Sequence, residues 1–198
     1  MTMGRTSKQI RYLFTELQAR MQDDSNDKYI EGYFAVFGKE IELAPGILEE
    51  IAPGAFDNAM SDDVRALNNH NTDIVLGRTK SGTLELKTDS YGLYGRIQIN
   101  PDDTDAMNLY NRVKRGDVDQ CSFGFDVGKE EVDWRDDGTV KFTITEVNPL
   151  WEVSPCTFPA YKETGIQARK EQVKEYHKRM LEARKTKLKE RLRECLSN

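Results

Sequence analysis

The sequence predicts an α+β fold: a curled or barrel-like, mostly antiparallel β-sheet flanked by short helices and followed by a C-terminal amphipathic helix. Two patterns predict it. Short runs of alternating apolar and polar residues recur over about the first 160 residues, as half-buried strands require. From residue 166 onward, apolar residues recur at helical spacing instead. We therefore expect a folded domain over residues 8–165 and a basic helical tail over residues 166–198.

The strands of the first half are recognised by their alternation. Ile10, Tyr12 and Phe14 alternate with polar neighbours, and residues 29–37 are apolar on both faces, which is typical of a central strand covered on each side. Residues 42–60 are rich in turn residues and are expected to form a loop that leads into a short helix. Further short strands are expected around residues 64–67, 74–76 and 83–88.

The second half combines one clear helix with further strands. Acidic residues fill the first turn of residues 100–116, an apolar stripe follows, and basic residues precede the final glycine, so a helix is expected there. A hairpin tip is expected at Asp136–Gly138. The strands of this half are expected at residues 93–99, 120–127, 140–147 and 151–158.

Charge is divided unevenly along the chain. The formal net charge is −5, but residues 167–198 contain eleven basic and five acidic residues, against 18 basic and 29 acidic residues in the remainder. An acidic body thus carries a basic tail. This division argues for two parts with different partners and against specific binding of nucleic acid.

Composition excludes several other classes of protein. No apolar run approaches the roughly 18 residues of a membrane span, and the N-terminus lacks the apolar stretch of a signal peptide, so a cytosolic protein is expected. Cys121, Cys156 and Cys195 form neither a paired framework nor a closely spaced ligand set. We therefore expect no disulfide, no metal and no cofactor.

The two histidines lie in different settings. His177 belongs to the tail, where it is expected to be a solvated surface residue. His70 lies in LNNHNTDIVLGRT, a polar cluster between two apolar strand segments. There the imidazole either is held by neighbouring amides or faces a partner, and the residues alone leave both roles open.

A serine with the features of a nucleophile lies in the segment CSFGF. Alternation places Cys121, Phe123 and Phe125 on one face of this strand and Ser122 with Gly124 on the other. The glycine leaves room for a substrate carbonyl to approach the hydroxyl, although a strand serine beside a glycine bulge fits the pattern as well. Cys121 is the alternative nucleophile, but its parity with the phenylalanines indicates a core position.

Two glutamates are candidates for an acid that orients the imidazole. Glu146 continues the apolar face of residues 140–144, and Glu152 stands between Trp151 and Val153. A carboxylate in such a place is costly unless it is paired. Either one could accept a hydrogen bond from one nitrogen of the histidine, so that the other nitrogen deprotonates the serine. The spacing does not choose between them.

Five segments between about Ile30 and Tyr161 carry a family likeness: IEGYFAVFG, EEIAPGAF, LNNHNTDIVLGRTKSGTLELKTDSYGL, GDVDQCSFGF and EVNPLWEVSPCTFPAY. Together they resemble the prohead proteases of tailed bacteriophages. These are capsid maturation serine peptidases whose fold is similar to that of the herpesvirus assemblins. The combination is far more specific than any single segment, and it implies an assemblin-like serine protease domain.

The resemblance implies roles for individual residues. The family's general base lies in an NHN-type segment and its nucleophile in an SFGF-type segment, which correspond to His70 and Ser122. Assemblins use a second histidine as third member; the body of this chain has no other, so an acid is implied. Glu146 is preferred for its strand position, with Glu152 as the substitute. Backbone amides and Arg78 are candidate oxyanion donors and stay unassigned.

The resemblance also implies a substrate and a place. Such a protein is expected to cut the scaffold, or the scaffold-like arm of the major capsid protein, and itself, inside the assembling prohead in the host cytoplasm. The basic tail is expected to dock into the scaffold, to be removed by self-cleavage, or to be a solvated helix, and self-association as a homo-oligomer is compatible with it. The alternatives are a noncatalytic scaffolding protein with the same fold, and a cysteine peptidase that uses Cys121 or Cys156 with His70.

Overall fold

The structure is a computed structural model. Its chain falls into two units, residues 1–162 and 163–198. In the described part, the first unit consists of β-sheets with short helices, and the second is the helix α2 (Glu163–Leu196). This arrangement confirms the predicted α+β class and the C-terminal helix. The residues that the structure describes are 9–13, 17–21, 27–158 and 163–196.

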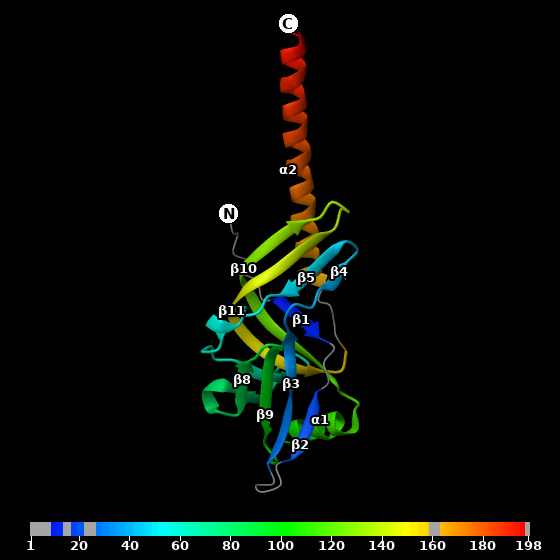
Figure 1. The fold of residues 1–198 in the computed structure, drawn as a ribbon. Helices are drawn as coiled ribbons and strands as arrows, with labels where there is room; N and C mark the ends of the chain where they lie inside the picture. The colour runs from blue at the N-terminus through cyan, green and yellow to red at the C-terminus, as the bar shows by residue number, and fades with distance from the viewer. Residues whose placement is uncertain (1–8, 14–16, 22–26, 159–162, 197–198) are drawn as a thin grey trace. The chain divides into compact units, whose positions relative to one another are not determined.

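The larger sheet contains seven strands of the described chain: β1 (Gln9–Leu13), β4 (Ile41–Ala44), β5 (Ile47–Ile51), β6 (Arg65–Asn68), β7 (Asn71–Arg78), β10 (Gln120–Trp134) and β11 (Val140–Cys156). β10 and β11 pair antiparallel and form a long ribbon (Figure 1). β1 lies beside β10, and β5 followed by β4 lies beside β11. β6 also pairs with β11, and β7 with β6. Because β5 and β6 run parallel to β11, this sheet is mixed.

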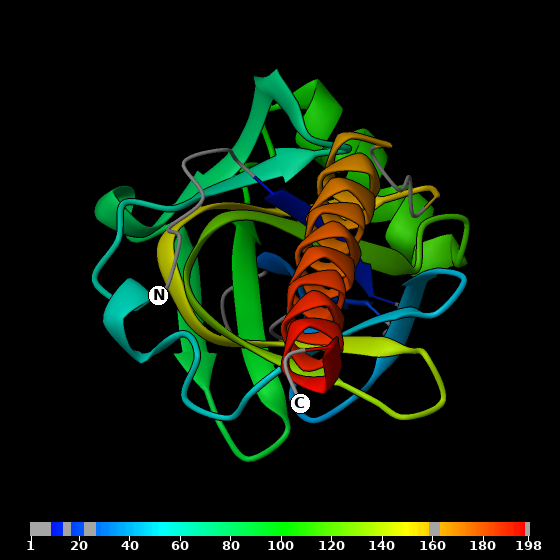
Figure 2. The same ribbon diagram turned by 90° about the horizontal axis from the view of Figure 1, so that it is seen from above.

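The smaller sheet, in the described residues, has the order β2 (Gln18–Met21), β3 (Lys28–Val36), β9 (Gly92–Ile99) and β8 (Leu84–Thr88), with antiparallel neighbours throughout. Both sheets as described keep edge strands, so the expected curl is present without closure into a barrel. Figure 2 shows how strongly the β10–β11 ribbon bends along its length.

One hydrophobic core lies between the two sheets. It joins Phe34 of β3 to Phe123 and Phe125 of β10. The Phe123 and Phe125 rings stack with centroids 5.0 Å apart, and Phe56 meets Phe123 edge-on at 5.7 Å. Cys121 is buried in the same cluster, so the face that alternation predicted for it is confirmed.

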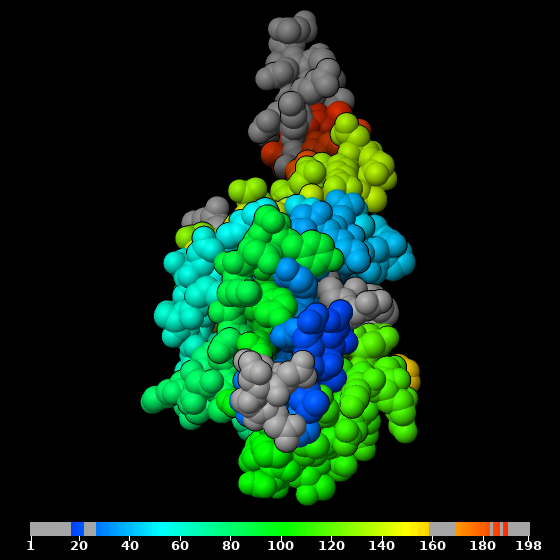
Figure 3. All heavy atoms as spheres, turned by 60° about the horizontal axis from the view of Figure 1, so that its bottom comes forward, coloured from blue at the N-terminus to red at the C-terminus, as the bar shows by residue number. Residues whose placement is uncertain are grey.

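The helix α1 (Thr104–Arg115) covers part of the smaller sheet, as its apolar stripe predicts. Its first turn is capped by Asp103, whose carboxylate accepts the N–H groups of Asp105 and Ala106. It ends at Gly116, whose φ of 86° suits a residue without a β-carbon. In Figure 3 its green atoms lie beside the blue atoms of β2, in agreement with the contacts between these elements. Its buried residues are Ala106, Leu109, Tyr110 and Val113.

Two segments differ from the sequence-based expectation. Residues 42–60 were expected to be a loop and a helix, but they contain the β4–β5 hairpin and only a three-residue 3₁₀ turn, η1 (Asp57–Ala59). Pro45 and Gly46 make a tight turn between strands here, and Gly46 has a φ of 73°. The strands expected at 140–147 and 151–158 are one continuous strand, β11. A second 3₁₀ turn, η2, is formed by Thr79–Ser81.

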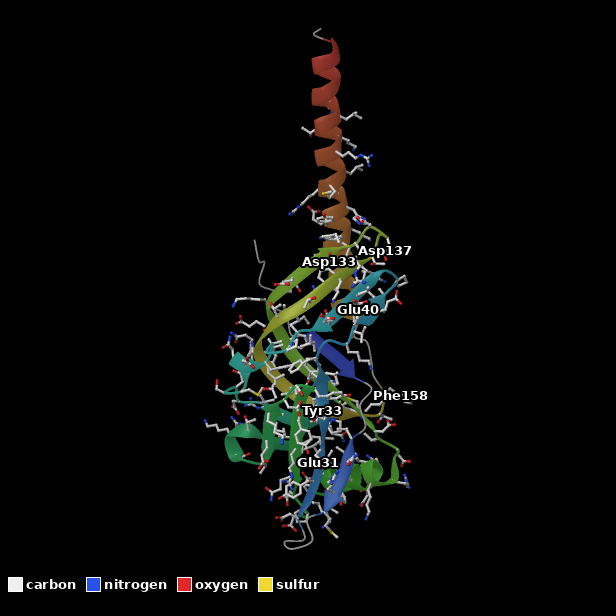
Figure 4. All side chains as sticks on the ribbon, viewed as in Figure 1. Glu31, Tyr33, Glu40, Asp133, Asp137 and Phe158 are labelled. Atoms are coloured by element: carbon white, nitrogen blue, oxygen red, sulfur yellow. The ribbon has the colours of Figure 1, made fainter. Side chains whose placement is uncertain are left out.

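The two ends of the β10–β11 ribbon are distinct. Figure 4 places Glu40, Asp133 and Asp137 at one end and Phe158, just beyond β11, at the other. Arg135 of the hairpin connection contacts the Glu40 carboxylate at 2.6 Å. This ion pair attaches the tip of the ribbon to the start of the β4–β5 hairpin.

The helix α2 presents Met180, Leu181 and Leu188 to solvent, each more than half exposed. His177 is exposed on the same helix, as expected from its polar surroundings in the sequence. Within the part of the chain that the structure describes, no helix combines the length and the apolar character that a membrane crossing requires.

Candidate active site

A two-residue turn positions His70. Asn68 and Asn71 pair at the end of the β6–β7 hairpin, and Asn69 and His70 form the turn between them. Both turn residues have positive φ, 50° and 61°, as a type I′ turn requires. Asparagine and histidine adopt this left-handed conformation more often than most residues with a β-carbon, although it costs them more than it costs glycine. The imidazole is therefore placed by the backbone at the tip of a short hairpin.

Hydrogen bonds attach this turn to the end of β11. The Asn69 N–H donates to the Pro155 carbonyl at 3.1 Å. The Asn69 side chain accepts the Thr157 N–H at 3.0 Å and donates to the Thr157 hydroxyl at 3.4 Å. The LNNHN segment therefore serves to dock the turn, and with it the imidazole, onto the strand that carries Glu152.

Ser122 lies on β10, directly opposite Ser154 of β11. Opposite residues of an antiparallel pair have β-carbons about 4.5–5.5 Å apart and share one face of the sheet. Gly124, two residues further, stands opposite Glu152. Alternation thus gathers the serine, Ser154 and Glu152 on one face, away from the phenylalanines of the core.

Glu152 is the acid that contacts His70. Its Oε1 lies 2.7 Å from His70 Nδ1, and its Oε2 accepts the Ser154 hydroxyl at 2.6 Å. The Glu152 side chain is 2% exposed and the His70 side chain 11%. An ionised carboxylate only accepts hydrogen bonds, so this contact places the imidazole proton on Nδ1 and leaves the Nε2 lone pair available as a base.

The Cys156 sulfur connects His70 with Ser122. It lies 3.9 Å from His70 Nε2, and Ser122 is one of its side-chain hydrogen-bond partners. The thiol also donates to the Ser154 carbonyl at 3.1 Å. Burial, followed by the charges of Cys121 and Glu152, raises the pKa of the Cys156 thiol well above its usual range. The imidazole and the hydroxyl are thus neighbours of one protonated thiol.

The other glutamate, Glu146, lies elsewhere on β11. It stands six residues before Glu152, which corresponds to roughly 20 Å along an extended strand, and it pairs with Lys129 across the ribbon. The Lys129 ammonium holds the pKa of Glu146 below its usual value, with further hydrogen bonds from Asn58 and Asn148. The expectation that this carboxylate needs a partner is confirmed, and the partner is a lysine.

Arg78 is engaged at the opposite end of the β6–β7 hairpin from His70. Its Nε contacts Asp63 Oδ1 at 2.6 Å, and its Nη2 contacts Asp63 Oδ2. The register of the hairpin pairs it with Arg65. Cys121, the alternative nucleophile, donates its thiol to the Tyr33 carbonyl at 2.9 Å within the core.

Sequence reasoning did not single out Ser154 or connect Cys156 with Ser122. A signal was present, because residues 152, 154 and 156 share one parity along β11 and therefore one face of the sheet. Considering these three residues together would have predicted the Ser154 hydroxyl and the Cys156 thiol beside the Glu152 carboxylate.

Comparison with known proteins identifies the family of this chain. A family model described as Caudovirus prohead serine protease matches residues 15–179. The prohead protease of Enterobacteria phage HK97 is 32% identical over 161 residues, which cover 79% of this chain and 67% of that protein. The structure of the bacteriophage T4 capsid assembly protease matches 77% of this chain and 98% of its own, with a TM-score of 0.49 and 13% identity. The chain belongs to the caudovirus prohead serine protease family.

Proposed function

We propose that this protein is the serine endopeptidase of phage capsid maturation, with Ser122 as nucleophile, His70 as general base and Glu152 as the acid that orients the base. Its substrates are the scaffold or the scaffold-like arm of the major capsid protein, and itself, inside the assembling prohead in the host cytoplasm. Family membership supports the activity. The 2.7 Å contact between Glu152 and His70 is the observation that carries the assignment of residues.

The proposed chemistry uses the three residues as follows. His70 Nε2 takes the proton of the Ser122 hydroxyl as its oxygen attacks the scissile carbonyl, and the imidazolium returns that proton to the leaving amine. Water then hydrolyses the acyl-enzyme by the same proton path. Glu152 stabilises the imidazolium throughout, because its Oε1 accepts the Nδ1–H. Contacts between nucleophile and base commonly tighten only when substrate binds.

Glu152 takes this role in preference to Glu146. The sequence pattern favoured Glu146. Its carboxylate lies on a distant part of β11 and is paired with Lys129 of β10. An acid that orients a base must lie within hydrogen-bonding reach of it. Glu152 meets this requirement, and its burial strengthens the electrostatic effect of its charge.

A cysteine peptidase is the second candidate, because Cys156 Sγ lies 3.9 Å from His70 Nε2. A cysteine nucleophile reacts as the thiolate and is usually activated by a lowered pKa. Burial has the opposite effect here and raises the pKa of Cys156. We therefore place the nucleophile on Ser122 and treat Cys156 as a buried neighbour.

The test of the proposed function is co-expression with the cognate capsid and scaffold proteins, followed by treatment of the purified enzyme with residue-specific reagents. We expect trimmed products, inhibition by a serine-reactive sulfonyl fluoride, and the mass of that reagent on the peptide that contains Ser122. A noncatalytic scaffolding protein would trim nothing. Inhibition through modified Cys156 would favour the cysteine peptidase. The intact mass of the purified enzyme, measured after it has stood in solution, shows whether it cleaves itself.

The raised pKa of Cys156 has its own measurable consequence. A higher pKa keeps the thiol neutral to higher pH, and only the thiolate is alkylated. Iodoacetamide at pH 8 should therefore modify Cys156 in the folded protein at less than about one-tenth of its rate in urea. Peptide mass spectrometry over time gives both rates. Equal rates in the two states would contradict the buried, neutral thiol.

A further inference from the structure

Ser154 contacts both the acid and the base of the site. Its hydroxyl donates to Glu152 Oε2 at 2.6 Å and accepts the backbone N–H of His70 at 3.3 Å. We propose that Ser154 is a positioning residue that holds the Glu152 carboxylate and the His70 turn in the relative orientation that proton transfer requires. This inference rests on the proposed function, because it assigns a task within the same site.

The first contact fixes the rotation of the carboxylate. The terminal torsion of a glutamate side chain has a broad energy profile, so one hydrogen bond to Oε1 leaves the group free to turn. With Oε2 held by Ser154, Oε1 is directed at His70 Nδ1. Both carboxylate oxygens then accept a hydrogen bond, which keeps the charge satisfied in a buried place.

The second contact supports a turn that is under conformational strain. His70 has a φ of 61°, a left-handed conformation that residues with a β-carbon adopt at a cost. Its N–H is bound by the Ser154 hydroxyl, while the neighbouring Asn69 N–H is bound by the Pro155 carbonyl. Two successive amides of the turn are thus attached to β11.

Burial makes this hydroxyl hard to replace. Ser154 is 0% exposed, so bulk water does not compete for its hydrogen bonds in the native structure. Ser154 also stands opposite Ser122 in the strand pairing, which places the positioning residue beside the nucleophile. Its hydroxyl donates to the acid, which assigns it to the orientation of Glu152.

The test compares three variants in a cleavage assay with the cognate substrate. Ser154→Ala should lower kcat about 10- to 100-fold with KM within about twofold, the effect of losing a hydrogen bond to a charged group. Ser154→Thr keeps the hydroxyl and should exceed the alanine variant at least about fivefold. Thr143→Ala, on the same strand but opposite Glu131 of the ribbon, is the matched control and should keep wild-type kcat.

A spectroscopic readout separates positioning from general stability. In the Ser122→Ala background, which prevents self-cleavage, the Nδ1–H proton of His70 should give a low-field NMR signal that broadens or shifts when Ser154 becomes alanine. The exposed His177 is the second histidine of the chain, and its carbon-bound ring protons serve as the internal reference. The signal should persist in Ser154→Thr.

The outcomes distinguish the two proposals. Wild-type kcat and an unchanged His70 signal in Ser154→Ala, while Ser122→Ala is inactive, would overturn the positioning role and leave the proposed function intact. A threonine variant no better than alanine would overturn it as well. Full cleavage by Ser122→Ala would overturn the proposed function itself.

Discussion

Replacing Ser122 by alanine is expected to lower kcat about 10⁴- to 10⁶-fold, because the attacking oxygen is removed while the rest of the site remains. The change deletes one atom opposite Ser154, where Ser122 is 0% exposed, so the fold should be retained. Cleavage of the cognate capsid or scaffold protein, followed by gel densitometry at several enzyme concentrations, measures the loss.

The matched control is Ser81→Ala, because Ser81 is an exposed serine of η2. It should keep wild-type kcat, and both variants should melt within a few degrees of the wild type. An alanine variant of Ser122 that trims its substrate at the wild-type rate would remove this residue as nucleophile. The next substitution would then be Cys156→Ala.

Glu152→Gln is expected to lower kcat about 10³- to 10⁴-fold with little change in KM. The amide keeps the size of the carboxylate but loses its charge, and it no longer dictates that the imidazole proton sits on Nδ1. The contact at stake is the 2.7 Å hydrogen bond from His70, which is buried from solvent. Steady-state cleavage kinetics and the melting temperature are measured together, so that loss of rate is separated from loss of fold.

Glu146→Gln is the matched control on the same strand. It removes the charge that pairs with the exposed Lys129, so we expect kcat within about twofold of wild type and a stability change below about 1 kcal/mol. The opposite result, an inactive Glu146 variant and an active Glu152 variant, would identify Glu146 as the acid, as the strand pattern favoured.

Local pattern made Ser122 and His70 candidates for the site, and the resemblance to the prohead proteases assigned their roles. CSFGF alternates strictly, and β10 is regular from Gln120 to Gly124, so the face of Ser122 was predictable. His70 stood in a polar cluster between two apolar strand segments, which left its role open. The proximity of these two residues could not be predicted in the same way. It depends on β6 and β10 both pairing with β11, which no local pattern reveals.

The preference between the two glutamates illustrates the limit of alternation. Glu146 was assigned to an inward face because every second residue from Val140 was expected to point the same way. This assignment assumes strand pairing without register shifts. The pairing of β10 with β11 shifts register repeatedly between Gly124 and Glu130. Each irregularity changes which residues stand opposite one another and bends the ribbon. A face assigned at one end of β11 therefore does not extend to the other.

The β4–β5 hairpin was missed for a related reason. Pro45 and Gly46 indicate a turn but do not reveal whether strands or a loop flank it. The flanking residues Ile47, Glu49 and Ile51 are all buried because β5 pairs with β11 on one side and β4 on the other. Pairing with β11 and β4 therefore makes this segment a strand. The buried Glu49 interrupts its apolar pattern and obscured the strand in the sequence.

The left-handed turn at Asn69 and His70 carries a conformational cost. Asparagine followed by glycine is the pair that best suits such a turn, and glycine would avoid a cost of about 1–2 kcal/mol. Glycine at position 70 would also remove the imidazole that contacts the buried Glu152 carboxylate, and a buried acceptor that loses its partner destabilises the fold. The contact that offsets the backbone cost of the turn is therefore the same contact that, under the proposed mechanism, orients the general base.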